Sequence, residues 1–366
     1  MARSRRNQHN QSDTDNARHE GALSNSAIAE LLALAADDAR MPLQKALRRA
    51  SRKAFMWPEE AALIAAAGRS LSELPAVGPT LSRIISNWID DPPTLPKPPE
   101  IRANFLGALE ARAILAKKPD WTTGIKGDLQ MHTGWSDGSG SIEDMARAAA
   151  ERGYKYIAIT DHSKGLKIAG GINEEQLEQQ AVEIEAVNSQ VAADGIGVQV
   201  LRSIELNLDT RGNGDMDEKS LRRLDLVLGC FHSALRKKED QTERYIAALR
   251  NPEIQILGHP RGRIYNYRLG LQADWQRVFD LAAELDKAVE IDGYPDRQDL
   301  SIDVLQIARK SGCRISLGTD AHDPQQLRFM DYSLAAAIRA GIKQDRILNF
   351  MAADELRNWA AKVRGA

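Results

Sequence analysis

The stretch Gly127-Asp128-Leu129-Gln130-Met131-His132 opens the part of the chain in which short β-rich runs alternate with helical segments. Such an alternation is typical of βαβ units, whose right-handed crossovers produce a parallel sheet. The pattern predicts seven strands, at 127–132, 156–162, 198–208, 224–232, 254–259, 288–293 and 313–319. Helix start signals lie between them, such as the capping-box pattern that begins at Ser141. We therefore expect an α/β domain over 125–366.

The chain ahead of this domain has a different composition. Residues 1–24 are polar, with almost no large apolar side chains, and we expect a disordered tail because such a segment cannot offset the entropy of ordering. Residues 25–91 have apolar side chains at helical spacing and predict a small helical domain. Residues 92–124 read as a proline-rich linker followed by a helix.

Composition limits the classes of function. The 366 residues, 43% hydrophobic and 27% charged, are typical of an ordinary globular protein, and no stretch has the length and apolarity of a membrane span or a secretory signal. Two cysteines in apolar runs indicate buried thiols in a reducing compartment, so we expect a cytoplasmic protein. A net charge of −2 means that any contact with nucleic acid requires a local basic patch.

Histidine placement gives the main functional signal. Five of the seven histidines stand at the carboxyl ends of predicted strands, where sites are built in open sheets and barrels of this class. They are His132, His162, His232, His259 and His322. Three acidic residues share this placement, namely Asp137, Glu205 and Asp320. A purely structural role would require all these placements to coincide by chance.

Five imidazoles and three carboxylates exceed what one ion needs, because a catalytic zinc takes about three protein ligands. We therefore expect two or three divalent ions, and the mixed nitrogen and oxygen ligands favour Mn or Zn. Clustered metals activate water and stabilise both oxygens of an in-line displacement at phosphorus. The predicted reaction is phosphoester hydrolysis.

These motifs resemble the PHP (polymerase and histidinol phosphatase) domain, and more narrowly the version at the C-terminus of bacterial family-X DNA polymerases. The resemblance rests on Gly127–Thr133 with Trp135–Gly138, on Ile159–Lys164, on Gly258-His259-Pro260 and on Gly318–His322. It continues through Gly262-Arg263, Val289–Asp292 and Ile347–Asn349 and covers about 125–366.

The resemblance implies a distorted seven-stranded β/α barrel with up to three metals, in which His132, Glu205, His259 and Asp320 are catalytic. Carried onto this chain, the ligand sets are Gln130, His132, Glu205 and Asp320; Glu205, His232 and His259; and Asp137, His162 and His322. The family usually has histidine where this chain has Gln130, and an amide oxygen is a weaker ligand for a transition metal.

Other residues are candidates for contacts with a substrate. Arg261 and Arg263, near Arg268, follow the His259 strand and could grip a phosphate with two hydrogen bonds each, although a solvated loop explains them nearly as well. Lys164 is a weaker candidate of the same kind.

The N-terminal region has two features that suit DNA. Lys45, Arg48, Arg49, Arg52 and Lys53 share one helix face, which is either a phosphate-contacting stripe or a solvated face of a packed helix. Ser72–Leu81 with Ile84-Ile85 resembles a helix-hairpin-helix, whose Val77, Gly78 and Thr80 would present backbone N–H groups to a DNA phosphate. The usual first glycine is Ala76 here.

This region resembles the small helical domain of family-X polymerases, but its second hairpin helix lacks the lysine that implies lyase activity. Pro92–Pro99 leads through one helix into the barrel and leaves no room for a polymerase module. We therefore predict a metal-dependent phosphoesterase that binds DNA without sequence specificity and acts in DNA repair, as a 3′–5′ exonuclease or another 3′ end-processing enzyme. The alternatives are a small-molecule phosphatase of the histidinol-phosphate type and a non-catalytic DNA-binding module with a decayed barrel.

Overall fold

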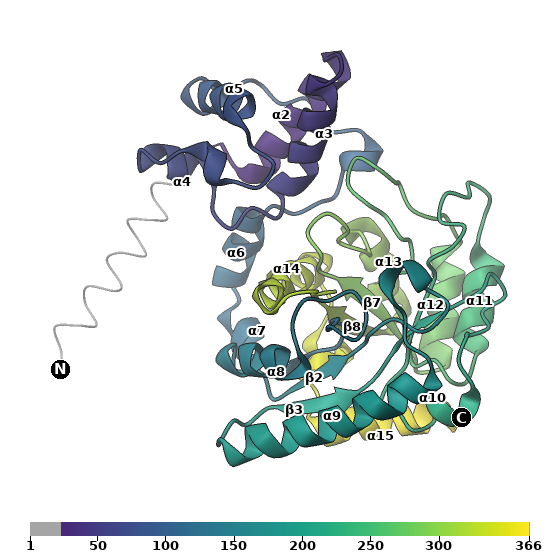
Figure 1. The fold of residues 1–366 in the computed structure, drawn as a ribbon. Coiled ribbons are helices and arrows are strands. Elements are labelled where there is room, and N and C mark those ends of the chain that lie inside the picture. Colours follow the sequence, from purple (N-terminus) through teal and green to yellow (C-terminus); the bar gives the residue numbers. More distant parts are fainter. Residues whose placement is uncertain (1–22, 366) are drawn as a thin grey trace. The chain divides into compact units, whose positions relative to one another are not determined.

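The computed structural model describes residues 23–365, which form two compact units (Figure 1). The first unit comprises the described residues up to Arg102 together with Gly107–Leu109. The second comprises Ala103–Leu106 and the residues from Glu110 onward. The predicted disordered tail, with His9 and His19, lies outside the described residues apart from Leu23 and Ser24.

The first unit is helical, as the sequence predicted. Small side chains allow its first two helices to pack closely, and the buried Ser51 hydroxyl donates to the carbonyl of Ala29 at 2.8 Å. Trp57 Nε1 donates to the carbonyl of Pro75 at 3.0 Å, which ties the turn before the last long helix to this core. The elements are α2 (Asn25–Asp38), α3 (Leu43–Ala54), α4 (Ala61–Ala66), η1 (Leu71–Glu73), α5 (Pro79–Asp90) and η2 (Glu100–Arg102).

The second unit is an α/β domain in which every pair of neighbouring strands is parallel. Its strands are short, buried and rich in β-branched or aromatic residues, as in Tyr156–Ile159. The described strands are β1 (Gly127–Asp128), β2 (Tyr156–Ile159), β3 (Gln199–Arg202), β4 (Glu205–Asn207), β5 (Leu228–Cys230), β6 (Ile256–Leu257), β7 (Ala288–Asp292) and β8 (Arg314–Gly318).

The run 198–208, predicted as one strand, is two strands that belong to different sheets. β3 completes a sheet of order β1-β2-β3, whereas β4 begins a sheet of order β4-β5-β6-β7-β8. Ser203 and Ile204 separate them, because β3 pairs with β2 and β4 pairs with β5. Two isolated parallel bridges, His162 with Glu205 and Met131 with Ala321, join the sheets at both seams. The strands therefore close into a barrel.

Helices follow most strands and cover the barrel (Figure 1). A capping box at Ser141 with Asp144 begins one of them, as the sequence predicted, and another at Asn173 with Gln176 begins a second. The elements are α6 (Ala108–Ala116), α7 (Pro119–Gly124), α8 (Ile142–Glu151), η3 (Lys167–Ala169), α9 (Glu174–Ala193), α10 (Glu218–Leu221), α11 (Thr242–Arg250), α12 (Trp275–Glu284), α13 (Ile302–Ser311), η4 (Pro324–Phe329), α14 (Met330–Ala340), η5 (Gln344–Arg346), η6 (Leu348–Phe350) and α15 (Ala353–Arg364).

The C-terminal helix α15 packs against the amino-terminal ends of the strands. Trp359 joins a buried apolar cluster with Tyr156 and Leu228, and its Nε1 donates to the carbonyl of Asp286, just before β7. Arg364 donates to the carbonyl of Leu224, ahead of β5. The carboxyl ends of the strands remain available for a site. No helix within residues 23–365 combines the length and apolar character needed to cross a bilayer.

Candidate metal centre

The structure brings the predicted ligands together where the strands end. His132 follows β1, His162 follows β2, His232 follows β5 and His259 follows β6. Because neighbouring strands are parallel, these ends meet at one edge of the barrel. The backbone bonds at the two seams, such as His132 N to the carbonyl of Ala321 at 2.7 Å, fix the relative positions of the loops.

Glu205 lies at the centre of the cluster and is fully buried. Its Oε1 is 2.8 Å from His232 Nε2 and 2.7 Å from His259 Nε2. Its Oε2 is 3.2 Å from His132 Nε2, and the same imidazole nitrogen is 3.0 Å from Asp320 Oδ1. One carboxylate therefore stands between histidines from three strands, as a bridging ligand would.

A second group forms around Asp137, which the loop after β1 carries. Its Oδ1 is 3.4 Å from His322 Nε2, 3.6 Å from His162 Nε2 and 4.0 Å from His132 Nδ1. The Asp137 side chain is 36% exposed, whereas that of Glu205 is 0% exposed. The site is thus closed around Glu205 and open to solvent around Asp137.

Two of the clustered residues have left-handed backbone conformations. His259 has φ 22° and Asp320 has φ 53°, a region that side-chain-bearing residues adopt at a cost. The surroundings hold both in place. Glu290 Oε2 accepts from His259 N at 2.8 Å, and Asp320 N donates to the carbonyl of Gln130 at 3.1 Å. Such strain is typical of functional positions.

The electrostatics of the cluster favour cations. Burial would lower the pKa of His259, but the Glu205 carboxylate outweighs it and raises that pKa to about 10. Burial lowers the pKa of His162 to about 3, which keeps this ring neutral and able to bind a metal. Burial would also raise the pKa of Asp320, yet Arg297 and His132 hold it well below its usual range. The carboxylates are therefore charged at neutral pH.

Unpaired buried atoms test whether divalent metals fit here. Gln130 Oε1, His132 Nδ1 and His162 Nδ1 are buried without a hydrogen-bond partner, although buried polar atoms are normally paired. Among residues 23–365, four overlapping sets occur in which all the ligand atoms of a set lie within 4.8 Å of one another. The sets are His132, Asp137, His162 and His322; His162, Glu205 and His232; Glu205, Cys230 and His259; and His132, Glu205 and Asp320. The donor set fits divalent transition metals.

Gln130 is chemically the weakest of the predicted metal ligands. Its side chain is fully buried, and Nε2 donates to Glu205 Oε2 at 3.2 Å. The amide nitrogen, which cannot bind a metal, therefore faces the carboxylate, while the unpaired oxygen faces away. Rotation of the amide by a half turn would exchange the two atoms and present a ligand.

Comparison with known proteins agrees with this geometry. The model of the PHP domain family matches residues 128–317, which is more than half of the chain. The chain belongs to the PHP domain family. Its barrel is therefore a metal-dependent phosphoesterase domain, as the order of the motifs predicted.

Relatives of two kinds share the PHP domain. The DNA polymerase/3′-5′ exonuclease PolX of Bacillus subtilis (strain 168) is 36% identical over 226 residues, which are 62% of this chain and 39% of the relative. The chain thus spans well under half the length of that relative. A probable phosphatase of Thermoanaerobacter sp. (strain X514) is 30% identical over 220 residues, which are 57% of this chain and 83% of the relative.

Among solved structures, the histidinol phosphate phosphatase of Lactococcus lactis subsp. lactis Il1403, in complex with zinc, L-histidinol and phosphate, is similar to this chain. The match has a TM-score of 0.43 and 16% identity, and it covers 60% of this chain and 94% of that chain.

The predicted substrate residues of the PHP domain have other partners. Arg261 is buried and donates to Ser301 Oγ at 3.0 Å, and Arg263 is buried and donates to the carbonyl of Ala103 at 2.9 Å. Lys164 is exposed and pairs with Glu174 at 2.6 Å. Arg263 lines a hollow beside His232 and His259 with its Nη2 bound to two backbone carbonyls, whereas Arg261 and Lys164 do not line that hollow. Their role as phosphate ligands stays a prediction.

Sequence reasoning missed Arg297, which the structure places at the metal site. Arg297 Nη1 forms a short ion pair with Asp320 Oδ2, and its side chain is 35% exposed. With Arg268 it lines a hollow of about 90 Å³ beside His232 and His259. No local pattern marks Arg297, because it lies in an irregular loop after β7 and only the fold brings it to Asp320.

Two acidic residues on β7 were quoted as part of the family likeness but not assigned to the site. Glu290 and Asp292 are fully buried on the face of β7 that points to the cluster, and burial raises the pKa of Glu290 to about 8. A signal was present, since Ala288-Val289-Glu290-Ile291-Asp292 has charges at alternate positions of an apolar strand. Two charges on one face of a buried strand indicate a polar pocket.

The predicted DNA-contacting stripe lies on α3. Lys45, Arg48, Arg49 and Lys53 are exposed, and Arg52 is partly exposed. Leu47, Ala50, Ser51 and Ala54 form the buried side of the same helix. Within residues 23–365, no acidic side chain forms an ion pair with Lys45, Arg48, Arg49 or Lys53. Four exposed positive charges are therefore not neutralised within the described chain.

The predicted hairpin residues form a tight turn before α5. Ala76 has φ 66°, the conformation that the usual glycine adopts without strain. Gly78 is the residue that precedes α5, and Pro79 and Thr80 begin the helix. Gly78 and Thr80 are exposed, whereas Val77 is buried and anchors the turn.

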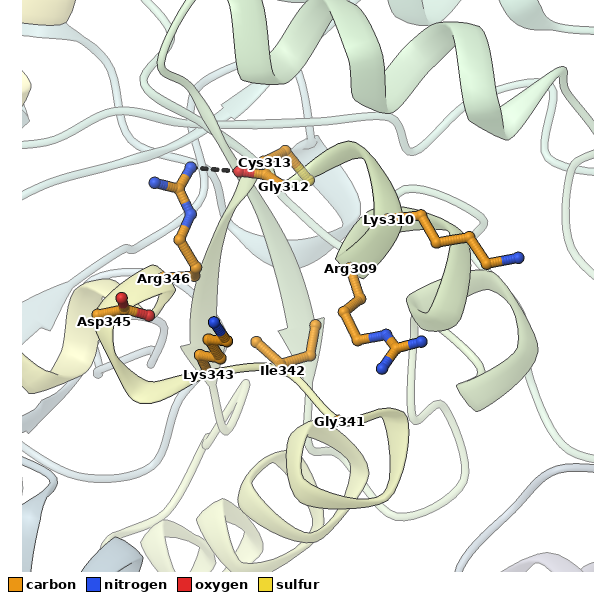
Figure 2. A pocket seen from close by; sticks show the side chains of 9 residues that line it. All are labelled: Arg309, Lys310, Gly312, Cys313, Gly341, Ile342, Lys343, Asp345 and Arg346. Atoms are coloured by element: carbon orange, nitrogen blue, oxygen red, sulfur yellow. Dashed lines mark hydrogen bonds between the residues drawn. The ribbon is translucent and has the colours of Figure 1, made fainter.

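A second hollow lies at the amino-terminal end of β8, far along the strand from Asp320 (Figure 2). Its volume is about 430 Å³, and its lining includes Arg309, Lys310 and Arg346. Arg309 and Lys310 belong to the last turn of α13, where positive charge stabilises a helix C-terminus. Figure 2 shows the charged ends pointing in different directions, so they do not gather around one anion.

Proposed function

We propose that this protein is a metal-dependent phosphoesterase that acts on DNA 3′ ends, as a 3′–5′ exonuclease or end-processing enzyme in repair. The observation that carries the proposal is the unneutralised basic face of α3 in a chain whose other unit is a PHP barrel. The similarity to a relative named DNA polymerase/3′-5′ exonuclease supports it.

Two or three divalent ions, Mn or Zn, would be held by the nine predicted ligands and would activate water and neutralise phosphate charge. Their holders are Gln130, His132, Asp137, His162, Glu205, His232, His259, Asp320 and His322. Glu205 remains ionised, since nearby histidines outweigh burial and lower its pKa well below the usual range. His132, Glu205, His259 and Asp320 form the enclosed catalytic side of the cluster.

Arg297 and Arg268 would bind the phosphate from the side that faces away from the metal ions. Both line the hollow beside His232 and His259, where a phosphate oxygen could reach a guanidinium and the metal ligands together. The planar guanidinium donates two parallel hydrogen bonds to a phosphate, which orients it for in-line attack.

The helical unit would bind the DNA backbone. Lys45, Arg48, Arg49 and Lys53 present charge from one face of α3, which suits phosphates of any sequence. The turn before α5 would offer the backbone N–H groups of Gly78 and Thr80, at a helix start where the dipole favours an anion, whereas Val77 N donates to the carbonyl of Leu74 at 3.1 Å. Contacts to backbone phosphates carry no sequence information, so we expect binding without sequence specificity.

We place this activity in the cytoplasm. Cys230 and Cys313 are both free and buried, as is usual where thiols stay reduced.

The deciding experiment measures hydrolysis by the Mn²⁺-loaded full chain on oligonucleotides with 3′-phosphate, 3′-hydroxyl or abasic ends, beside histidinol phosphate. We expect turnover at DNA 3′ ends to exceed turnover of histidinol phosphate. Asp320→Ala should abolish hydrolysis and leave DNA binding nearly unchanged, while Asp345→Ala, on an exposed residue, should be neutral. Loss of both activities in Asp320→Ala would mean that the barrel itself holds the strand.

A small-molecule phosphatase of the histidinol-phosphate type is the second candidate. It is favoured by the match to a probable phosphatase, 83% of whose length aligns with this chain. In that case the helical unit is a structural appendage. Faster hydrolysis of histidinol phosphate than of any oligonucleotide would establish this alternative.

A further inference from the structure

A four-residue segment, Ala103–Leu106, precedes the barrel in sequence but belongs to the barrel unit. We call it the strap. One side chain binds its backbone at both polar groups of a single residue: Leu106 N donates to Gln298 Oε1 at 2.8 Å, and Gln298 Nε2 donates to Leu106 O at 2.9 Å. These atoms are buried, so the amide of Gln298 replaces the strand partner that Leu106 would otherwise lack.

Arg263 provides the second attachment of the strap. Its Nη2 donates to the carbonyl of Ala103 at 2.9 Å and to that of Asn104 at 3.3 Å. The guanidinium carbon lies 3.8 Å from the ring centroid of Phe105, and that ring meets Tyr265 edge-on at 5.2 Å. Arg263, which is only 4% exposed, thus contacts three of the four residues of the strap.

The residues that hold the strap come from two loops at the metal site. The His259 loop (260–270) follows β6, and the Arg297 loop (293–300) follows β7. The loops are bound to each other, because Tyr265 N donates to the carbonyl of Asp296 at 2.7 Å and Gly262 N donates to Asp299 Oδ2 at 2.6 Å. The strap and both loops therefore form one hydrogen-bonded assembly beside the ligands.

Gln298 connects this assembly to Arg297. Gln298 has φ 41°, a conformation that requires support from its surroundings. That support comes from the two bonds to Leu106 and a third from Nε2 to the carbonyl of Pro295 at 2.9 Å. The next residue back, Arg297, points into the cluster and pairs with Asp320. Loss of the strap contacts would free the loop that aims Arg297.

We propose that the strap is a positioning element of the phosphoesterase site: Gln298 and Arg263 bind it and thereby hold Arg297 where it contacts the substrate phosphate. The inference rests on the proposed function, because it assigns Arg297 to the phosphate. Gln298 and Arg263 are positioning residues: Gln298 does not line the hollow beside His232 and His259, and Arg263 lines it with its Nη2 bound to the strap. A side chain held in place before binding loses less freedom when the phosphate arrives, which gives tighter binding.

The test uses the Mn²⁺-loaded full chain, bis(p-nitrophenyl) phosphate as substrate and inorganic phosphate as inhibitor. For Gln298→Ala we expect KM and the phosphate inhibition constant to rise about tenfold, kcat to change less than about threefold and metal content to stay the same. Gln344→Ala is the matched control, since Gln344 makes an exposed hydrogen bond with Asp120. Unchanged inhibition by phosphate in a folded Gln298→Ala protein would overturn the proposal, and so would loss of metal.

A double-mutant cycle separates positioning from a general structural role. If Gln298 acts through Arg297, then Gln298→Ala should add nothing to the inhibition constant once Arg297→Gln is present. Additive effects would contradict this route. Phe105→Ala removes the stacking contact from the strap side and should also raise the phosphate inhibition constant. This variant replaces Gln298→Ala in the test if Gln298→Ala does not fold. No shift in Phe105→Ala would then count against the strap.

The proposed function and the role of the strap can be refuted separately. Absence of hydrolysis of every phosphate ester by the metal-loaded wild type would refute the proposed function. Calorimetric binding of inorganic phosphate would still compare the wild type with Gln298→Ala, and equal affinities there would refute the strap alone.

Discussion

Glu205 shows how single residues define the chemistry of the cluster. The barrel excludes water from its side chain, and three histidines from different strands approach its two oxygens within 3.2 Å. A buried carboxylate is costly unless opposite charge or hydrogen-bond donors surround it. The imidazole nitrogens supply hydrogen bonds here, and divalent metals bound to the neutral rings would supply the opposite charge.

We predict that Gln130→His will tighten metal binding, because imidazole is a better ligand than an amide oxygen for Mn or Zn. A chelator competition assay should show at least about a tenfold higher affinity, in the range by which ligand surroundings change affinity. Equal affinity and equal metal content in both proteins would show that position 130 is not a ligand.

Lys287 gives a pH-dependent prediction outside the metal site. It is 4% exposed, and burial lowers its pKa to about 8, against about 10.4 in an unfolded chain. Between about pH 8 and pH 10 the unfolded chain holds a proton that the folded chain has lost, so stability rises with pH. The stability is full above about pH 10.4 and is lost as pH falls through about 8.

Urea unfolding of the wild type should show this rise, at up to about 1.4 kcal/mol per pH unit, relative to Lys287→Met. Lys155→Met, on an exposed lysine, is the control and should follow the wild type. Parallel curves for the wild type and Lys287→Met would mean that the buried ammonium keeps its ordinary pKa.

At the scale of elements, α3 has a buried side and an exposed basic side. The alternation of buried and exposed positions was readable from the sequence, because helical periodicity is local. The hairpin was readable too, although Ala76 stands where glycine is usual and the structure places it at φ 66°. The function of this exposed face could not be read from the sequence, since an exposed basic face is consistent with solvation as well as with phosphate contacts.

Charge reversal on α3 should weaken DNA binding. Arg48→Glu with Arg49→Glu removes two exposed charges, and each lost phosphate contact should reduce the slope of log affinity against log salt by about 0.9. Fluorescence anisotropy at several salt concentrations measures this slope. Arg309→Glu with Lys310→Glu, at the opposite end of the barrel from the metal site, is the matched control. An unchanged slope in the α3 variant would favour the small-molecule phosphatase.

The strands show where local patterns stop being sufficient. The apolar runs predicted all the strand positions, because short buried strands need continuous hydrophobic residues. The run 198–208 nevertheless divides between two sheets at Ser203 and Ile204. That division depends on which strands pair with which, and pairing between distant segments leaves no mark within the run itself.

At the scale of the whole molecule, metal binding should be coupled to folding. The unpaired buried atoms at Gln130, His132 and His162 are satisfied only if a ligand enters. A ligand at a hundred times its dissociation constant stabilises the folded state by about 2.7 kcal/mol. For a domain of this size that corresponds to a Tm increase of about 5–10 °C.

Calorimetric scans with Mn²⁺ and with a chelator should show this difference in the wild type. The Asp320→Ala protein should lose most of this increase in Tm, because one of its sets of metal ligands is incomplete. The same shift in both proteins, or none in the wild type, would contradict binding at this cluster.

Several properties were determined by the sequence itself. The strand-terminal histidines, the apolar runs and the basic helix face are local features, and the order of the motifs was enough to identify a PHP barrel with its ligands at one edge. The predicted roles of Arg261 and Arg263 in substrate binding stay predictions, and the structure uses both side chains to hold loops and the strap.

Only the tertiary structure decided which cation faces the site. Arg297 reaches Asp320 from a loop in which Gln298 adopts a left-handed conformation and binds a segment 192 positions earlier in the chain. The physical reason is the range of the interactions: periodicity and strand ends follow from neighbouring residues, whereas the aim of a loop side chain depends on contacts that exist only after distant parts of the chain have packed together.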